Sequence, residues 1–271
     1  MQFSSIGSGS KGNGTLIRSG ETLLLIDCGF SLKETLARLA AKGVSPEQLD
    51  AIFVTHEHGD HINGVAALAR RYQIPVYLSA GTRYVGKLSK VAQLQTIADA
   101  SPVVVGEIEV LPVAVPHDAR EPLQYLFHSG GLCIGVLTDL GCITRHVVDH
   151  YQQCDGLLLE CNHDPYLLST GPYPPSLKGR VGGNYGHLSN QQAAELLRLV
   201  DRERLQRLVV AHISEQNNAR ERVLEQLLPE VDAERLVFAD QGQGFDWITL
   251  KEAGMARCDN TLFGTLSLGG N

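Results

Sequence analysis

The segment Thr55-His56-Glu57-His58-Gly59-Asp60-His61 is the part of this sequence best suited to chemistry. Three imidazoles and the Asp60 carboxylate fall within residues 56–61, directly after the apolar run 51–54. Imidazole is the commonest metal ligand in proteins, and carboxylates complete sites for divalent ions. His56 and His58, two apart in an extended turn, can hold one ion, while Asp60 and His61 can reach a second. Packing at the end of a buried strand requires no histidines, so the segment predicts a metal site rather than a solvated loop.

The spacing H-x-H-x-D-H resembles the signature of the metallo-β-lactamase-fold hydrolases, and the resemblance extends along most of the chain. Three more apolar, strand-like runs, 108–115, 132–137 and 208–211, each end near a single His or Asp. Strand ends are where functional side chains gather in sheet-based enzymes. The resemblance implies that one ion is bound by His56, His58 and His117, the other by Asp60, His61 and His212, and that Asp139 bridges them.

The expected ligands are all nitrogen or oxygen donors, so the site suits Zn²⁺, Mn²⁺ or Fe²⁺ and selects no soft ion. The resemblance implies two divalent ions about 3.5–4 Å apart, with a bridging hydroxide as the nucleophile. Coordination lowers the pKa of bound water toward about 7, so hydroxide is available at neutral pH. Family members that reduce oxygen at two irons usually carry Glu at the position of His58. Hydrolysis is therefore favoured over redox chemistry.

Three further segments, 7–13 (GSGSKGN), 155–164 (DGLLLECNHD) and 186–189 (GHLS), resemble the YycJ-like (WalJ-like) branch of the family. This branch is related to the nucleases that process the 3′ end of tRNA. In those nucleases a His paired with a Glu protonates the leaving oxygen, and His187 and Glu160 lie at the corresponding places. The expected catalytic residues are therefore Asp60, His187 and Glu160. Cys161 departs from the branch, where Ser is expected.

The segment 166–183 joins Glu160 to His187 and is rich in Gly, Pro and Tyr. Its composition predicts a long loop without a core element, and such loops in compact domains are usually functional or disordered. Lys178 and Arg180 are its only cations, so they are expected to hold the nucleic-acid backbone unless the loop is merely solvated. Asn162 and His163 are expected to contact substrate or to shape their loop.

The composition fits a compact enzyme whose partner is not held by a broad basic surface. The chain has 271 residues, is 43% hydrophobic and carries a net charge of −7, which two bound dications would offset locally. No apolar run approaches the roughly 20 residues of a membrane span, and the N-terminus shows no export signal. Six cysteines without Cys-x-x-Cys spacing indicate free thiols in a reducing compartment, and hence the cytoplasm.

Alternating strand and helix patterns predict two α/β halves that must position these residues. Strands are expected at 23–26, 76–78, 103–105, 108–115 and 124–127, and helices at 31–43, 62–72, 189–200 and 223–228. Strands with helices on their outer faces imply an αββα sandwich of two packed mixed β-sheets, which the family resemblance also implies. We expect one domain over 1–254 and a loosely attached tail over 255–271.

These expectations converge on a dinuclear-metal phosphodiesterase that acts on DNA or RNA. The branch resemblance implies an exonuclease that starts at a 5′ end. Two alternatives stay open: a hydrolase of small molecules, either cyclic or nucleotide phosphodiesters or thioesters, and a non-catalytic metal-binding module on the same fold. The acidic net charge keeps the first alternative open, and the presence of every expected ligand disfavours the second.

Overall fold

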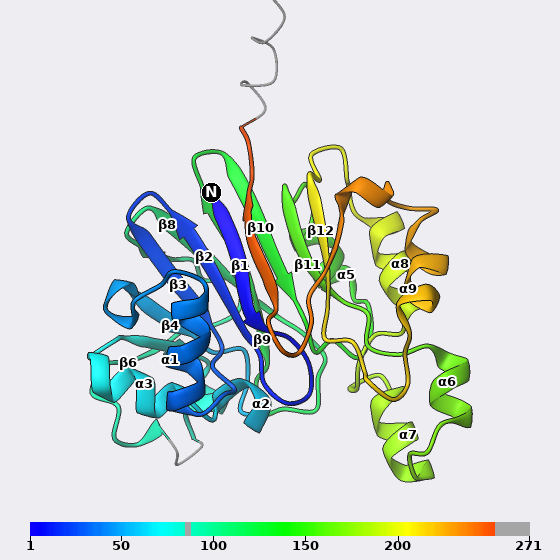
Figure 1. Ribbon diagram of the computed structural model, residues 1–271, viewed down its shortest axis with the longest axis horizontal. Coiled ribbons are helices and arrows are strands. Elements are labelled where there is room, and N and C mark those ends of the chain that lie inside the picture. Colours follow the sequence, from blue (N-terminus) through cyan, green and yellow to red (C-terminus); the bar gives the residue numbers. More distant parts are fainter. Residues whose placement is uncertain (85–87, 253–271) are drawn as a thin grey trace, which may run out of the picture.

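Two seven-stranded β-sheets face each other at the centre of the protein, whose computed structural model describes residues 1–84 and 88–252 (Figure 1). The first sheet has the order β14-β1-β2-β3-β4-β5-β6. Its strands are β1 (Gln2–Gly7), β2 (Gly14–Ser19), β3 (Thr22–Ile26), β4 (Ala51–Phe53), β5 (Val76–Leu78), β6 (Leu94–Thr96) and β14 (Phe245–Thr249). Antiparallel pairing from β14 to β3 gives way to parallel pairing from β3 to β6.

The second sheet has the order β13-β12-β11-β10-β9-β8-β7 and the same change of direction. Its strands are β7 (Val103–Val105), β8 (Ile108–Ala114), β9 (Leu123–Ser129), β10 (Leu132–Leu137), β11 (Gly156–Glu160), β12 (Arg207–Ala211) and β13 (Leu236–Phe238). Strands β7 to β10 are antiparallel and β10 to β13 are parallel. The expected pair of mixed sheets is confirmed.

Helices cover the outer face of each sheet. The first half contributes α1 (Leu32–Ala41), α2 (Gly59–Ile62), α3 (Val65–Tyr72) and α4 (Ala80–Arg83). The second contributes α5 (Arg145–His150), α6 (Pro165–Thr170), α7 (Pro175–Val181), α8 (Asn190–Leu199) and α9 (Arg220–Leu227). Figure 1 shows α1 and α3 on one side of the sandwich and α8 and α9 on the other, with α6 and α7 reaching below them. The layer order is therefore αββα.

Buried strands of this sandwich alternate between two cores. In β3, Leu24 and Ile26 face the layer between the sheets, whereas Leu23 and Leu25 face the layer under α1 and α3. Because both faces are covered, the strand is a continuous apolar run rather than an alternating one. A fully buried Leu or Ile stabilises the fold by about 1.5–3 kcal/mol.

The helix ends follow the local sequence closely. Ser31 caps α1 by accepting a hydrogen bond from the backbone of Glu34, and Ser189 forms a complete capping box with Gln192 at α8. The expected helix over 62–72 begins instead at Val65 as α3. Gly64 before it lies so close to the Phe30 carbonyl oxygen that a Cβ there would be 2.2 Å from that atom. This close approach ties the turn after β4 to the turn after β3.

The prediction of an irregular loop over 166–183 was wrong, because the segment contains α6 and α7. Proline occupies the first turn of each helix. A backbone N–H at that position has no hydrogen-bond partner within the helix, so proline, which lacks this N–H, costs no hydrogen bond there. Asp164 caps α6 by accepting a hydrogen bond from the backbone of Leu167. Prolines therefore begin helices here rather than prevent them.

The chain ends of the described part lie within the first sheet. Strand β14 pairs with β1, so residues up to 249 belong to the sandwich. The single domain over 1–254 stays a prediction, and the proposed tail over 255–271 lies outside the described residues. Among the described helices, none is long and apolar enough to cross a membrane.

Candidate metal centre

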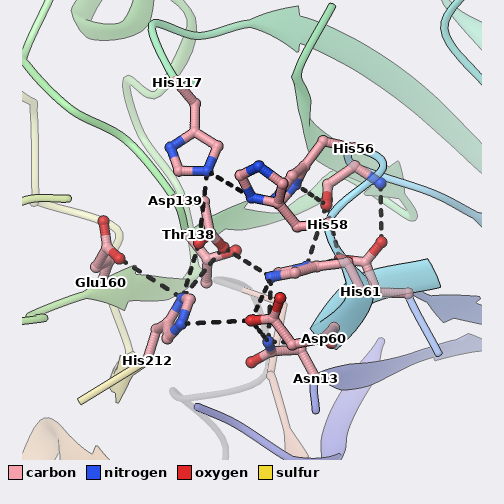
Figure 2. A network of polar contacts seen from close by, with 12 residues as sticks. Asn13, His56, His58, Asp60, His61, His117, Thr138, Asp139, Glu160 and His212 are labelled. Atoms are coloured by element: carbon pink, nitrogen blue, oxygen red, sulfur yellow. Dashed lines mark hydrogen bonds and ion pairs between the residues drawn. The ribbon is translucent and has the colours of Figure 1, made fainter. Parts of the chain in front are cut away.

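Four strand ends bring the predicted ligands to one edge of the sandwich. Residues 55–61 follow β4, His117 follows β8, Asp139 follows β10 and His212 follows β12. The carboxyl ends of neighbouring parallel strands meet at one edge of a sheet, so residues far apart in sequence converge there. Figure 2 shows the imidazoles of these segments directed toward Asp139.

The first group of donors consists of His56, His58 and His117. Nε2 of His56 lies 3.0 Å from Nδ1 of His58, and Nε2 of His117 lies 3.3 Å from the same nitrogen. His56 and His117 are buried, while His58 is partly exposed. These three nitrogens face one point and fit a single divalent ion.

The second group of donors lies around Asp139. Its Oδ2 is 3.2 Å from Nε2 of His61, which lies 3.5 Å from Oδ2 of Asp60. Nε2 of His212 lies 3.9 Å from the same Asp60 oxygen. Oδ1 of Asp139 also lies 4.0 Å from His117, so this carboxylate stands between the two groups, as the resemblance implies.

Buried hydrogen bonds fix the orientation of the histidine rings. Asp27 contacts Nδ1 of His61 at 2.8 Å, and Thr55 Oγ1 donates to Asp27 at 2.8 Å. The same hydroxyl lies 2.9 Å from Nδ1 of His56. Nδ1 of His117 donates to the carbonyl of Gly186 at 2.9 Å. With one ring nitrogen held in this way, the other is turned toward the metal position.

The charges of the site suit cations. Burial alone would raise the pKa of the Asp139 carboxyl, but His212 and His61 hold that pKa well below its ordinary value. Burial, together with the charge of His61, lowers the pKa of His56 well below its ordinary value. The Asp139 carboxyl is thus ionised and the His56 imidazole neutral, which are the forms in which these groups bind metals. The donors fit divalent metal ions.

Three residues of the site adopt left-handed backbone conformations that side chains other than glycine rarely take. Asp27, Asp139 and His212 have φ angles of 60°, 53° and 51°. Each of these residues comes immediately or shortly after a strand. Its left-handed backbone conformation turns the side chain toward the centre of the site. Such strain persists where the surrounding structure holds it, and it is common at functional sites.

His187 and Glu160 form a pair beside the metal donors. Nδ1 of His187 lies 2.7 Å from Oε1 of the fully buried Glu160. The other carboxylate oxygen, Oε2, accepts backbone hydrogen bonds from Leu140 and Leu188. Burial alone would lower the pKa of His187, but the Glu160 carboxylate raises it to about 9. The raised pKa favours the protonated imidazole, and His187 lines the adjoining cavity.

A cavity of about 340 Å³ opens beside these residues. Its lining includes His58, Asp60, Asp139, His187 and His212 together with Ser10, Asn162, Tyr173, Leu177 and Arg180. The helix α7 forms one wall, and it is tied to the centre because the Arg180 guanidinium pairs with Asp118. Asp118 in turn lies 3.4 Å from Nε2 of His117. A substrate group at the metal position would therefore meet a cation.

The four residues predicted to bind substrate are divided between two surfaces. Arg180 and Asn162 line the cavity, although the Asn162 amide donates to the carbonyl of His212 at 3.0 Å. Lys178 and His163 line a separate groove between α7 and α8. The Lys178 ammonium donates to the carbonyl of Ser169, so it points away from the metal position. The expectation that both cations of this segment face one site is therefore corrected, because a helix separates residues 178 and 180 onto different faces.

Sequence reasoning overlooked several residues that shape the centre. Thr55 links Asp27 to His56, Ser8 accepts a hydrogen bond from the backbone of His212 at 2.9 Å, and Asp118 holds Arg180. Asp118 follows His117 directly, so its position was a usable signal. Nothing in the local sequence of Ser8 points to a partner more than 200 residues away.

Comparisons with known proteins agree with this architecture. A family model described as a β-lactamase superfamily domain matches residues 22–213. Exodeoxyribonuclease WalJ of Streptococcus pneumoniae is 34% identical over 254 residues, which cover 91% of this chain and 92% of that protein. Exodeoxyribonuclease YycJ of Bacillus anthracis is 33% identical over 227 residues, which cover 82% and 85%. The crystal structure of Zn²⁺-bound PqqB from Methylobacterium extorquens superposes with a TM-score of 0.69 at 17% identity, covering 92% of this chain and all of that one.

Proposed function

This chain belongs to the metallo-β-lactamase superfamily, in the branch of the exodeoxyribonucleases WalJ and YycJ, and we propose that it is an exonuclease that hydrolyses DNA from a 5′ end. It is a metal-dependent hydrolase, and the choice of bond rests on one observation. His187 is paired with Glu160, which raises its pKa, and it stands beside the metal donors. The alkoxide that leaves a phosphodiester of DNA needs a proton, whereas the thiolate that leaves a thioester does not.

We propose two divalent ions, Zn²⁺, Mn²⁺ or Fe²⁺, as cofactors. His56, His58 and His117 would hold one, Asp60, His61 and His212 the other, and Asp139 would bridge them. Two such ions supply an activated water and neutralise charge that develops on the phosphoryl oxygens. The convergence of these donors around an ionised, buried Asp139 supports this assignment.

The residues around the cavity then have separate tasks. Arg180 offers a planar, charged fork suited to two phosphate oxygens. Its pairing with Asp118 holds the guanidinium at the cavity until a phosphate competes for it. His187 donates its proton to the leaving oxygen, and Glu160 keeps the imidazole protonated and oriented.

Labelled substrates test this proposal directly. Protein loaded with Mn²⁺ or Zn²⁺ is incubated with DNA or RNA labelled at either end, with bis(4-nitrophenyl) phosphate, and with a thioester. Early release of labelled mononucleotide from the 5′ end of DNA supports the proposal, and Asp139→Ala serves as the inactive control. Cleavage of only the small phosphodiester or the thioester would favour the small-molecule hydrolase instead. If none of these substrates is cleaved, the result would favour a non-catalytic metal-binding module.

We further propose that the protein works in the cytoplasm. The five cysteines within the described residues are free thiols, and four of them are buried. Free thiols persist in reducing compartments. Fractionation of cells in which the protein carries an epitope tag tests this location.

A further inference from the structure

Cys133 and Cys154 lie side by side at the end of the second sheet that is remote from the metal centre. Cys133 is near the start of β10, and Cys154 precedes β11. Their sulfur atoms are 3.9 Å apart, and both side chains pack in the core between the sheet and helices α5, α8 and α9. The two cysteines are 21 positions apart in the chain, so no short sequence motif predicts the pair.

The backbone around these thiols matches the geometry of a disulfide. Strands β10 and β11 are parallel, with Ile134 opposite Gly156, and the backbone N–H of Asp155 donates to the carbonyl of Cys133 at 2.8 Å. Cys154 is thus one residue removed from the position opposite Cys133. Given the spacing of adjacent strands, this offset places the two Cα atoms about 6 Å apart, within the range that disulfides span. Rotation of the side chains can bring the sulfurs to bonding distance.

The surroundings favour a reactive thiolate at Cys133. The hydrogen bond from Cys154, followed by the one from His128 on the neighbouring strand β9, lowers the pKa of the Cys133 thiol to about 6. The ion pair of Asp155 with Arg204 and the carboxylate of Glu109 are the other charges that face the pair and His128. By contrast, burial raises the pKa of the Cys28 thiol to about 12. The proximity of two cysteines and a histidine therefore distinguishes the surroundings of Cys133 from those of Cys28.

We propose that Cys133 and Cys154 are an oxidation site, which a peroxide converts into an intramolecular disulfide. The Cys133 thiolate attacks one peroxide oxygen, the O–O bond breaks and a sulfenic acid forms as hydroxide leaves. The Cys154 sulfur then attacks the Cys133 sulfur, the S–S bond forms, and the sulfenic oxygen leaves as water. Two thiols and one hydrogen peroxide give one disulfide and two waters.

The disulfide would close a loop that contains α5 and Asp139. Such closure restricts the unfolded chain and thereby stabilises the folded protein. The cross-link lies at the opposite end of β10 from Asp139, so the metal donors keep their positions. Oxidation should therefore strengthen the segment that carries the central carboxylate without altering the site itself.

Peptide mapping of the zinc-loaded full chain tests the proposal. Trypsin places Cys133 with Cys142 in peptide 121–145 and Cys154 with Cys161 in peptide 146–178. We therefore use a Cys142→Ser/Cys161→Ser protein, in which a link between these peptides identifies the pair uniquely. After hydrogen peroxide and alkylation, we expect the linked mass, its loss on reduction, and a Tm higher by roughly 5–10 °C.

Two further variants make the outcome decisive. Cys133→Ser in the same background should abolish both the linked mass and the rise in Tm. Cys142→Ser alone, which removes the more exposed thiol, should retain the rise in Tm. Alkylation of Cys133 and Cys154 after peroxide treatment, or a link from either of them to peptide 258–271, would overturn the proposal.

Discussion

Replacing Glu160 with Gln tests whether His187 acts as the acid that protonates the leaving oxygen. The carboxylate lies 2.7 Å from Nδ1 of His187 and is fully buried, so its charge acts on the imidazole with little screening. Gln preserves the size of the side chain and removes that charge. The expected result is a change in the pH dependence of the rate rather than a uniform loss.

The size of the effect follows from the two pKa values. Burial alone would lower the pKa of His187, and the Glu160 carboxylate raises it to about 9. For the variant we take the ordinary histidine value of 6.5, since burial still lowers the pKa there and Asp139 still raises it. The protonated fraction at pH 8 should then fall on the order of 30-fold, but less than about twofold at pH 6. Because the imidazole must be protonated, activity falls as the pH rises through its pKa. Cations bound at the metal centre would lower the pKa in both enzymes, so the quantity to measure is the separation of the two descending limbs, about 2.5 pH units.

The assay compares rates from about pH 5 to about pH 10, the range over which the histidine ionises in the two enzymes, on two substrates. The first is end-labelled DNA, whose leaving alkoxide needs a proton. The second is bis(4-nitrophenyl) phosphate, whose leaving phenolate needs little. His187→Ala should lower the rate on DNA by about 10²–10⁴-fold and that on the nitrophenyl ester much less, with metal content unchanged.

Three results would refute this reasoning. One is an unshifted descending limb in Glu160→Gln. Another is an equal loss on both substrates in His187→Ala. The third is loss of metal from either variant, which would make the residue a ligand or a structural element rather than a source of protons.

Four other substitutions, one of them with a matched control, test separate parts of the structure. Asp139→Ala should reduce the bound metal from near two ions per chain and abolish hydrolysis; elemental analysis that finds both ions in an active variant would contradict the ligand assignment. Arg180→Ala should raise KM for DNA and lower the slope of log affinity against log salt by about 1, whereas Lys178→Ala, the matched control on the same helix, should leave that slope unchanged. Thr55→Val should weaken metal affinity about 10–100-fold, measured by competition with a chelator, because the hydrogen bonds that orient the ligand imidazole are lost. Phe53→Ala should lower the free energy of unfolding by about 3–5 kcal/mol in urea denaturation, because this side chain is fully buried between the sheets; a loss below 1 kcal/mol, roughly the cost of a tolerated swap, would contradict that packing.

Most of the fold could be predicted from local sequence patterns. The strand β3 and the helices α1 and α8 carry continuous apolar runs or capping residues that specify them without reference to distant segments. The segment of α6 and α7 was mispredicted because its prolines and glycines were read as loop formers. Their effect depends on position, since proline at the first turn of a helix loses no hydrogen bond.

The sequence by itself determined which chemical groups the site contains and the order in which they occur. Four of the donors fall within residues 56–61, and this close spacing already restricted them to a common centre. They are His56, His58, Asp60 and His61. His117, Asp139 and His212 could be placed at strand ends from the apolar runs that precede them. This much is local information, because a strand and its last residue are neighbours in the chain.

Only the tertiary structure decided how these groups meet. The register of β10 and β11 sets the contact between Cys133 and Cys154, and the opposite ends of the same strands bring Asp139 to the ligand histidines and Glu160 to His187. The separation of Arg180 from Lys178 likewise depends on how α7 packs. Such contacts join residues that are distant in the chain, and they form because burial of two sheet faces fixes the register and orientation of every strand at once.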